Sequence, residues 1–246
     1  MLEALGLRKA FGALEVTRDV SLTLPAGARH AVVGPNGSGK TTLFDLLTGE
    51  IGADAGEIRL AGRDLTRLPP DARARAGLTR SFQKNNLFPD LTVRENLGLA
   101  VAIGKGWGGV FWRRFEGMPR LGDRIEELAQ SIRVADSLDR AVRTLPYGVQ
   151  RQLEIGLALA VTPKVLLLDE PTAGMSTEET RAMTALIGSL PREISLLIIE
   201  HDMGVVFEIA ERITVLDYGS ILIEGEPAEV RGSELVRRRY FGERTP

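Results

Sequence analysis

The sequence contains no cysteine, which excludes disulfide bonds and thiolate chemistry. It also lacks long hydrophobic runs: apolar stretches such as residues 165–168 and 194–199 are far shorter than the roughly 18 residues that a membrane-spanning helix needs. The N-terminal segment carries Glu3, Arg8 and Lys9 and has no apolar core of the signal-peptide type. We therefore expect a chain that does not cross a bilayer and that has a cytoplasmic address.

An excess of charge of either sign is missing as well. The 246 residues include 31 Lys and Arg against 33 Asp and Glu, which gives a net charge of -2. There is thus no overall attraction to nucleic acid or anionic lipid. With 43% hydrophobic and 26% charged residues, the composition is that of a globular protein, and the length suits one large α/β domain or two small lobes.

Strand patterns occupy both ends of the chain, and a helical pattern lies between them. Near the N-terminus, strands are predicted at residues 4–8, 20–24, 29–33 and 57–61, with a helix at 41–48. Helical spacing is clearest at 123–132 and 149–160, and nearly all-apolar strands return at 165–169, 195–199 and 213–216. These patterns predict one domain with a mostly parallel sheet: a core lobe of residues 1–84 and 161–246, and an inserted helical lobe of residues 85–160.

Residues 34–41 match the phosphate-loop pattern G-x-x-x-x-G-K-[ST] and lie between a predicted apolar strand and a predicted helix. Glycines let successive backbone N–H groups point at phosphate oxygens, and the helix contributes its positive end. Lys40 adds a charge for the terminal phosphates, and the Thr41 hydroxyl is placed to bind Mg²⁺. The predicted nucleotide-binding residues are Gly34, Pro35, Asn36, Gly37, Ser38, Gly39, Lys40, Thr41 and Thr42.

A second motif is the apolar strand at 165–168, which ends in Asp169 and Glu170. We predict that Asp169 holds Mg²⁺ and that Glu170 polarises the attacking water, because phosphoryl transfer mainly needs an in-line nucleophile. Apolar strands often end in an acidic residue, so this motif is weak alone. Combined with the phosphate loop, it predicts nucleotide hydrolysis.

These motifs together resemble the ATP-binding-cassette (ABC) ATPases over nearly the whole chain. The resemblance includes Gln83, residues 145–152 where the family's LSGGQ signature belongs, and His201 after an apolar strand. It implies that Gln83 reaches Mg²⁺ and the water, that His201 contacts the γ-phosphate, and that Phe11 stacks on adenine with Val16 beside the ribose. Taken alone, such a Phe or His is more often structural.

The resemblance also implies the fold and the cofactors. The expected fold is α/β, of the P-loop NTPase ABC ATPase type, with a mostly parallel sheet core, an N-terminal antiparallel β part and the inserted helical lobe. The expected cofactors are ATP and Mg²⁺. His30 matches no motif, and we expect it to be structural.

Within the family, the chain most resembles the larger ATPase of importers for branched-chain amino acids, with urea and short-amide importers close behind. The similarity lies in residues 86–97, 151–155 and 200–203 and in the tail 240–243. Residues 104–120, which include both tryptophans, match the position of an insertion in that ATPase. This insert is either a surface loop or a segment facing the membrane or a transport subunit.

By the same resemblance, each ATP lies between the phosphate loop of one chain and the signature of another, with Gly148 contributing in trans. The implied partners are a second ABC ATPase subunit in a homo- or heterodimer, two transmembrane permease subunits and, indirectly, a periplasmic or surface binding protein, but no nucleic acid. The implied location is the cytoplasmic face of the cell membrane. The alternatives are the ATPase of a lipid or polysaccharide exporter, or a non-transport ABC protein acting on nucleic acid.

The signature segment departs from the family pattern. Pro146, Tyr147 and Val149 stand where serine, glycine and glutamine are usual, and Pro146 has neither a hydroxyl nor an N–H group. Ser176 stands where the family often has an aspartate. Gly148 and a helix predicted to begin near Val149 still offer backbone N–H groups. We therefore predict two unequal nucleotide-facing ends.

Overall fold

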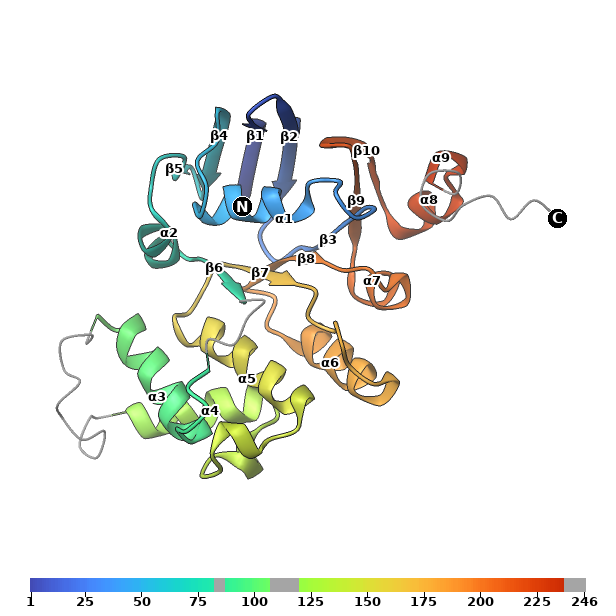
Figure 1. Cartoon of the computed structure of the whole chain (residues 1–246). Helices are drawn as coiled ribbons and strands as arrows, with labels where there is room; N and C mark the ends of the chain where they lie inside the picture. Colours follow the sequence, from blue (N-terminus) through green and yellow to red (C-terminus); the bar gives the residue numbers. More distant parts are fainter. Residues whose placement is uncertain (82–86, 107–119, 237–246) are drawn as a thin grey trace.

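Two sheets form the core of the computed structural model, which describes residues 1–81, 87–106 and 120–236 (Figure 1). The antiparallel sheet has the order β2-β1-β4-β5, from β1 (Leu2–Phe11), β2 (Leu14–Leu24), β4 (Ala55–Leu60) and β5 (Arg63–Asp64). The six-stranded sheet has the order β10-β9-β3-β8-β7-β6. Its strands are β3 (Arg29–Val33), β6 (Leu78–Ser81), β7 (Val165–Asp169), β8 (Ser195–Ile199), β9 (Arg212–Asp217) and β10 (Ser220–Gly225). Only β10 pairs antiparallel in it.

Helix α1 (Lys40–Thr48) packs between the two sheets (Figure 1). Its buried face, with Leu43, Phe44 and Leu47, shares one hydrophobic cluster with residues from both sheets. Helix α2 (Pro70–Ala76) precedes β6 and sends Arg73 onto the carbonyls of Leu46 and Leu47 at the end of α1. The helix that follows the phosphate loop is thereby held along its buried face and at its C-terminal end.

A three-helix unit, α3 (Val93–Gly104), α4 (Leu121–Ser131) and α5 (Tyr147–Ala160), lies below the sheets in Figure 1. Its apolar side chains form one cluster with α6 (Thr177–Ser189) and with the adjoining face of β7 and β8. Helix α7 (Met203–Ile209) follows β8, and α8 (Pro227–Gly232) and α9 (Glu234–Val236) follow β10. Val206, Val230 and Val236 of these helices pack with β3 and β9, whereas Val205 and Ile209 of α7 join the cluster of the three-helix unit. The expected α/β class, with parallel and antiparallel parts, is confirmed.

The strands at 29–33, 165–169 and 195–199 lie where the sequence predicts them. Other predicted bounds are wrong by a few residues: β1, β2 and β9 are longer, β4 begins at Ala55 and ends before Ala61, and α4 spans 121–131. Helices α1 and α5 begin earlier than predicted, at Lys40 and Tyr147. In α5 the extended Pro146 is the N-cap, and its carbonyl accepts the Gln150 N–H at 3.1 Å. The helix therefore begins before Val149.

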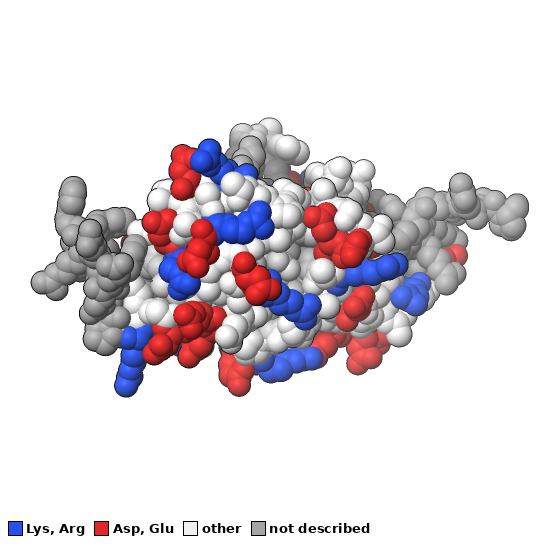
Figure 2. Space-filling view, turned by 90° about the horizontal axis from the view of Figure 1, so that it is seen from below, with Lys and Arg blue, Asp and Glu red and all other residues white. Residues whose placement is uncertain are grey.

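The described part of the chain holds no helix with the length and hydropathy to span a bilayer. Seen from the three-helix end, acidic and basic side chains are interspersed over the surface (Figure 2).

Candidate nucleotide site

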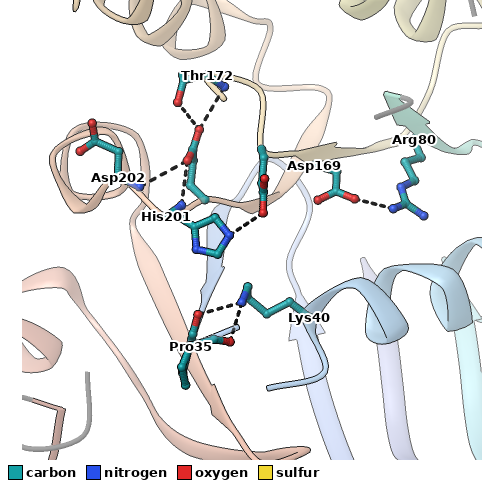
Figure 3. A network of polar contacts seen from close by, with 10 residues as sticks. Pro35, Lys40, Arg80, Asp169, Thr172, His201 and Asp202 are labelled. Carbon is teal, nitrogen blue, oxygen red and sulfur yellow. Dashed lines mark hydrogen bonds and ion pairs between the residues drawn. The ribbon is translucent and has the colours of Figure 1, made fainter. Parts of the chain in front are cut away.

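The candidate site lies where the parallel strands β3, β8 and β7 end side by side. The carboxyl ends of neighbouring parallel strands meet at one sheet edge, where ligands bind in open α/β sheets. This arrangement brings together the loop after β3, Asp169 and Glu170 after β7, and His201 after β8 (Figure 3). Residues far apart in sequence thus form one polar cluster.

Two glycines let the phosphate loop pass close to neighbouring backbone. A Cβ on Gly34 would lie 2.2 Å from the carbonyl oxygen of Leu216, and one on Gly39, at φ 102°, would lie 2.8 Å from that of Val16. A side chain at either position would push the loop away from β9 or β2. The glycines are therefore required by tight packing around the loop.

Lys40 is buried and turned back onto its own loop, where its Nζ donates to the carbonyls of Gly34 at 2.7 Å and Pro35 at 2.9 Å (Figure 3). Burial lowers the pKa of Lys40, and the nearby carboxylates of Glu170 and Asp169 oppose that shift. Ser38 is also buried, and its Oγ has no hydrogen-bond partner among the described residues. Pro35, Asn36, Gly37 and Thr41 are exposed, and Thr42 is half-buried.

Helix α1 begins here without a side-chain cap and without an acidic residue in its first turn. Its first N–H groups therefore remain available as donors, and its positive end is not neutralised locally. A loop of backbone donors with a buried lysine is suited to an anion such as a polyphosphate.

Asp169 is buried at the end of β7, with Arg80 of β6 on its Oδ2 (Figure 3). The same guanidinium contacts Asp45 of α1 at 2.6 Å. Burial raises the pKa of Asp169, and Arg80 opposes the rise. The other oxygen, Oδ1, is buried and has no hydrogen-bond partner among the described residues. Arg80 therefore fixes the carboxylate and leaves one oxygen free.

Glu170 has a left-handed backbone, with φ 46°, and its N–H donates to the carbonyl of Ile199 at 2.9 Å. Its Oε1 lies 2.5 Å from His201 Nε2 (Figure 3). Such a conformation is uncommon for a residue other than glycine and is often held at functional sites. The two contacts, to Ile199 and to His201, join Glu170 to the end of β8.

Glu200 organises both loops from inside, a role that sequence reasoning missed. It is buried, and its Oε1 accepts the Thr172 N–H at 3.1 Å and the Thr172 hydroxyl, while Oε2 accepts the His201 N–H at 2.8 Å (Figure 3). Its position between an apolar strand and His201 could have indicated a role in the site. Arg80 was also missed, because a strand arginine carries no recognisable pattern.

The predicted adenine-side residues lie on the antiparallel sheet. Phe11, at the end of β1, is 51% exposed, and Lys9 Nζ lies 5.6 Å from its ring centroid. The backbone of Val16 on β2 adjoins Gly39. Gln83 lies outside the described residues, as does most of the 104–120 insert and the 240–243 tail. His30 is buried and bonds to Thr214 Oγ1 at 2.8 Å, and burial lowers its pKa to about 4, consistent with a structural residue.

Gly148 lies apart from this cluster, in the first turn of α5. Its N–H donates to Glu179 Oε1 at 3.2 Å. Glu179 also forms a capping box with Ser176, the N-cap of α6. The amide predicted to face a second nucleotide is thus held by a carboxylate of its own chain.

The residues present fit a magnesium ion bound together with phosphate. The described residues form no cluster of three or more His, Asp or Glu side chains for a self-contained metal centre. Mg²⁺ in nucleotide enzymes usually takes one or two carboxylates and the phosphates themselves. The free, buried Oδ1 of Asp169 matches that requirement.

Comparison with known proteins agrees with this geometry. Residues 17–173 match the family model for "ABC transporter". The chain is 37% identical to the high-affinity branched-chain amino acid transport ATP-binding protein BraF of Pseudomonas aeruginosa, over 99% of this chain and 98% of that one. It is 33% identical to the lipopolysaccharide export system ATP-binding protein LptB of Haemophilus influenzae, over 99% and 98%. The ADP conformation of the ATP-binding cassette MJ1267 superposes with a TM-score of 0.84 and 26% identity, over 99% of each chain.

Proposed function

The chain belongs to the ABC transporter family of ATP-binding cassettes, and we propose that it is the ATP-hydrolysing subunit of a membrane importer for branched-chain amino acids. The observation that carries this proposal is the full-length similarity to BraF. The grouping of Lys40, Asp169, Glu170 and His201 at one sheet edge supports the hydrolytic part.

In the proposed complex, the phosphate loop and the first turn of α1 hold the phosphates of ATP. Lys40 exchanges its two carbonyl partners for the terminal phosphates, and the unpartnered Ser38 hydroxyl faces an acceptor. The half-exposed Phe11 ring stacks on adenine, with Val16 beside the ribose.

Thr41, Gln83 and Asp169 are the proposed protein ligands of Mg²⁺, and a bound ion would neutralise phosphate charge. Glu170 accepts a hydrogen bond from the attacking water and aligns it, and His201 donates to the γ-phosphate. Glu200 keeps His201 in place through its backbone. Gly148 acts on the ATP of a second ATPase subunit, in a homo- or heterodimer.

A groove beside β6 is the proposed contact with the permease. It has a volume of about 270 Å³ and apolar walls from α2, α3 and α5, including Ala74, Ala100, Leu157 and Val161. Glu50 and Glu154 also line it. Glu154 is already paired with Arg151, and Arg80 also lies in the lining. The apolar walls and the exposed Glu50 therefore suit a short helix of the permease that carries apolar residues and one basic residue facing Glu50. This contact would place the chain at the cytoplasmic face of the membrane, with a binding protein acting on the other side.

The test is reconstitution in proteoliposomes with the membrane subunits encoded beside this chain. We expect ATP hydrolysis to rise when a binding protein loaded with leucine, isoleucine or valine is added, and labelled amino acid to accumulate. The Glu170→Gln variant is the control for ATP dependence. Stimulation by urea or a short amide alone would correct the substrate, whereas ATP-driven movement of lipid or polysaccharide away from the ATPase side would overturn import.

A further inference from the structure

Tyr147, which replaces a signature glycine, contacts the loop that follows the catalytic carboxylates. Its Oη donates to the carbonyl of Ala173 at 3.2 Å, and its ring is 3.6 Å from the position that a Cβ on Gly174 would take. Ala173 is three residues after Glu170, and its own N–H donates back to the Glu170 carbonyl at 3.1 Å. The tyrosine therefore connects α5 to the segment that carries Glu170.

Arg151 lies one helical turn further along α5 and holds the same tyrosine. Its Nε donates to Tyr147 Oη at 2.9 Å, and its guanidinium carbon lies 5.4 Å from the ring centroid. Its Nη1 contacts Glu154 Oε2 at 2.8 Å. These i,i+4 and i,i+3 spacings place all three side chains on one face of the helix.

Glu154 is the end of this chain of contacts and lines the groove beside β6. It is only 7% exposed, and burial raises its pKa, against the opposing effect of Arg151. The contacts thus run from the groove through Glu154, Arg151 and Tyr147 to Ala173. They join this groove, whose lining also includes Arg80, to the backbone three residues from Glu170.

We propose that Glu154, Arg151 and Tyr147 form a relay that couples occupation of the groove to the position of the 170–176 loop. The relay rests on the proposed function for the identity of the groove's occupant, a permease segment. A segment that covers the groove removes water from the Glu154–Arg151 pair, and their interaction strengthens in the drier surroundings. Arg151 then holds Tyr147 more firmly on Ala173, which orders the loop. All three are positioning residues.

Hydrogen exchange of the isolated chain tests the relay without a transporter. Tyr147→Phe removes the hydroxyl and keeps the ring. Glu154→Gln removes the negative charge that pairs with Arg151. We expect each variant to speed exchange in a peptide covering residues 172–177 by about three- to tenfold, the size of one lost hydrogen bond. The double variant should exchange no faster than the faster single variant, because both changes interrupt the same series of contacts from Glu154 to Ala173.

Matched controls separate the relay from general destabilisation. Glu127→Gln breaks another i,i+3 pair, with Arg124 at 3.2 Å in α4, and Tyr218→Phe removes a hydroxyl from a 72% exposed tyrosine. Both should leave the 172–177 peptide unchanged. Unfolding midpoints measured by circular dichroism identify any variant that is globally destabilised. Such a variant is replaced in the experiment by Arg151→Lys, which keeps the positive charge but loses the Nε donor to Tyr147. Unchanged exchange in Glu154→Gln, or additive effects in the double variant, would overturn the relay.

The assembled transporter supplies the second readout. In Glu154→Gln, stimulation of hydrolysis by the loaded binding protein should fall about threefold or more, while co-purification with the membrane subunits persists. If no membrane subunit binds the wild-type chain, the proposed function fails, yet the exchange experiment still decides whether the relay exists. Normal stimulation in a variant whose loop exchange is raised would show that the loop contact carries no signal.

Discussion

At the phosphate-loop end, Lys40, Asp169, Glu170 and His201 meet at one sheet edge, whereas at the signature end Pro146 stands where a serine donor is usual and Glu179 already holds the Gly148 amide. The first end consists of the groups proposed to bind phosphate and activate water. The second offers fewer donors, because Pro146 has neither a hydroxyl nor an N–H group and Glu179 holds the Gly148 amide. A nucleotide held by this chain's loop would therefore meet the full proposed set of residues, whereas one presented to its signature would meet fewer donors.

This difference shows how one subunit can contribute unequally to two nucleotide sites. Removing a donor aimed at transition-state charge costs about 10² to 10³ in rate. If this chain pairs with a different ATPase, hydrolysis should concentrate at the site formed by this chain's phosphate loop and the partner's signature. The opposite site should bind ATP and turn over slowly.

The largest expected effect comes from Lys40→Ala, which removes the buried positive charge of the phosphate-loop end. We expect hydrolysis by the assembled transporter to fall about a thousandfold and ATP binding to weaken. Steady-state phosphate release and equilibrium nucleotide binding measure the two effects. Lys105→Ala, at the exposed end of α3, is the matched control. A near-normal rate in Lys40→Ala would mean that the phosphate-loop assignment is wrong.

The asymmetry itself is tested with Glu170→Gln. Loss of the carboxylate should slow hydrolysis about a hundredfold or more while leaving the phosphate contacts intact, so that ATP binds and traps a closed dimer. In a heterodimer, the same change in the partner's matching glutamate should cost much less. Steady-state hydrolysis of each reconstituted transporter gives the comparison. Equal losses, or a larger loss from the partner's variant, contradict unequal sites, and a homodimer would instead have uniformly slow sites.

A substitution of Arg80 tests whether this arginine positions Asp169 at the phosphate-loop end. Arg80→Met should leave Asp169 buried without its cation and misplace the oxygen that remains free. We expect the affinity for Mn²⁺, measured by electron paramagnetic resonance in the presence of ATP, to fall about tenfold. Arg75→Met, which breaks an exposed pair with Asp71, is the control. Unchanged metal affinity would remove Arg80 from the site.

The smallest expected effect concerns the signature end. Glu179→Gln removes a negative charge facing the first turn of α5, where a second nucleotide would place phosphate. The ATP concentration needed for dimer formation should fall about two- to fivefold, which light scattering of a hydrolysis-deficient background can measure. Glu178→Gln, its exposed neighbour, should have no such effect. A higher ATP requirement in Glu179→Gln would mean that Glu179 supports the signature amide.

The sequence predicted the parts of the site that lie in short continuous segments. The loop 34–41 and the strand ending in Asp169 and Glu170 are recognisable because strand, loop and helix patterns adjoin the functional residues. The start of α5 was predicted two residues too late, since the proline before it resembles a loop residue rather than an N-cap. Arg80 and Glu200 were missed because their partners are distant in sequence.

The sequence by itself thus determined the fold class and supplied the residues proposed for phosphate binding and hydrolysis, because local patterns and residue chemistry indicate them. Only the tertiary structure decided how those residues are used. Arg80 and Asp169 are 89 positions apart, and Gly148 and Glu179 are 31 apart. The first contact arises when β6 pairs with β7, and the second when α5 packs beside α6. Packing of these separate elements therefore leaves Asp169 Oδ1 and Ser38 Oγ without a partner in the described part of the chain at the phosphate-loop end, whereas the Gly148 amide at the signature end is held by Glu179.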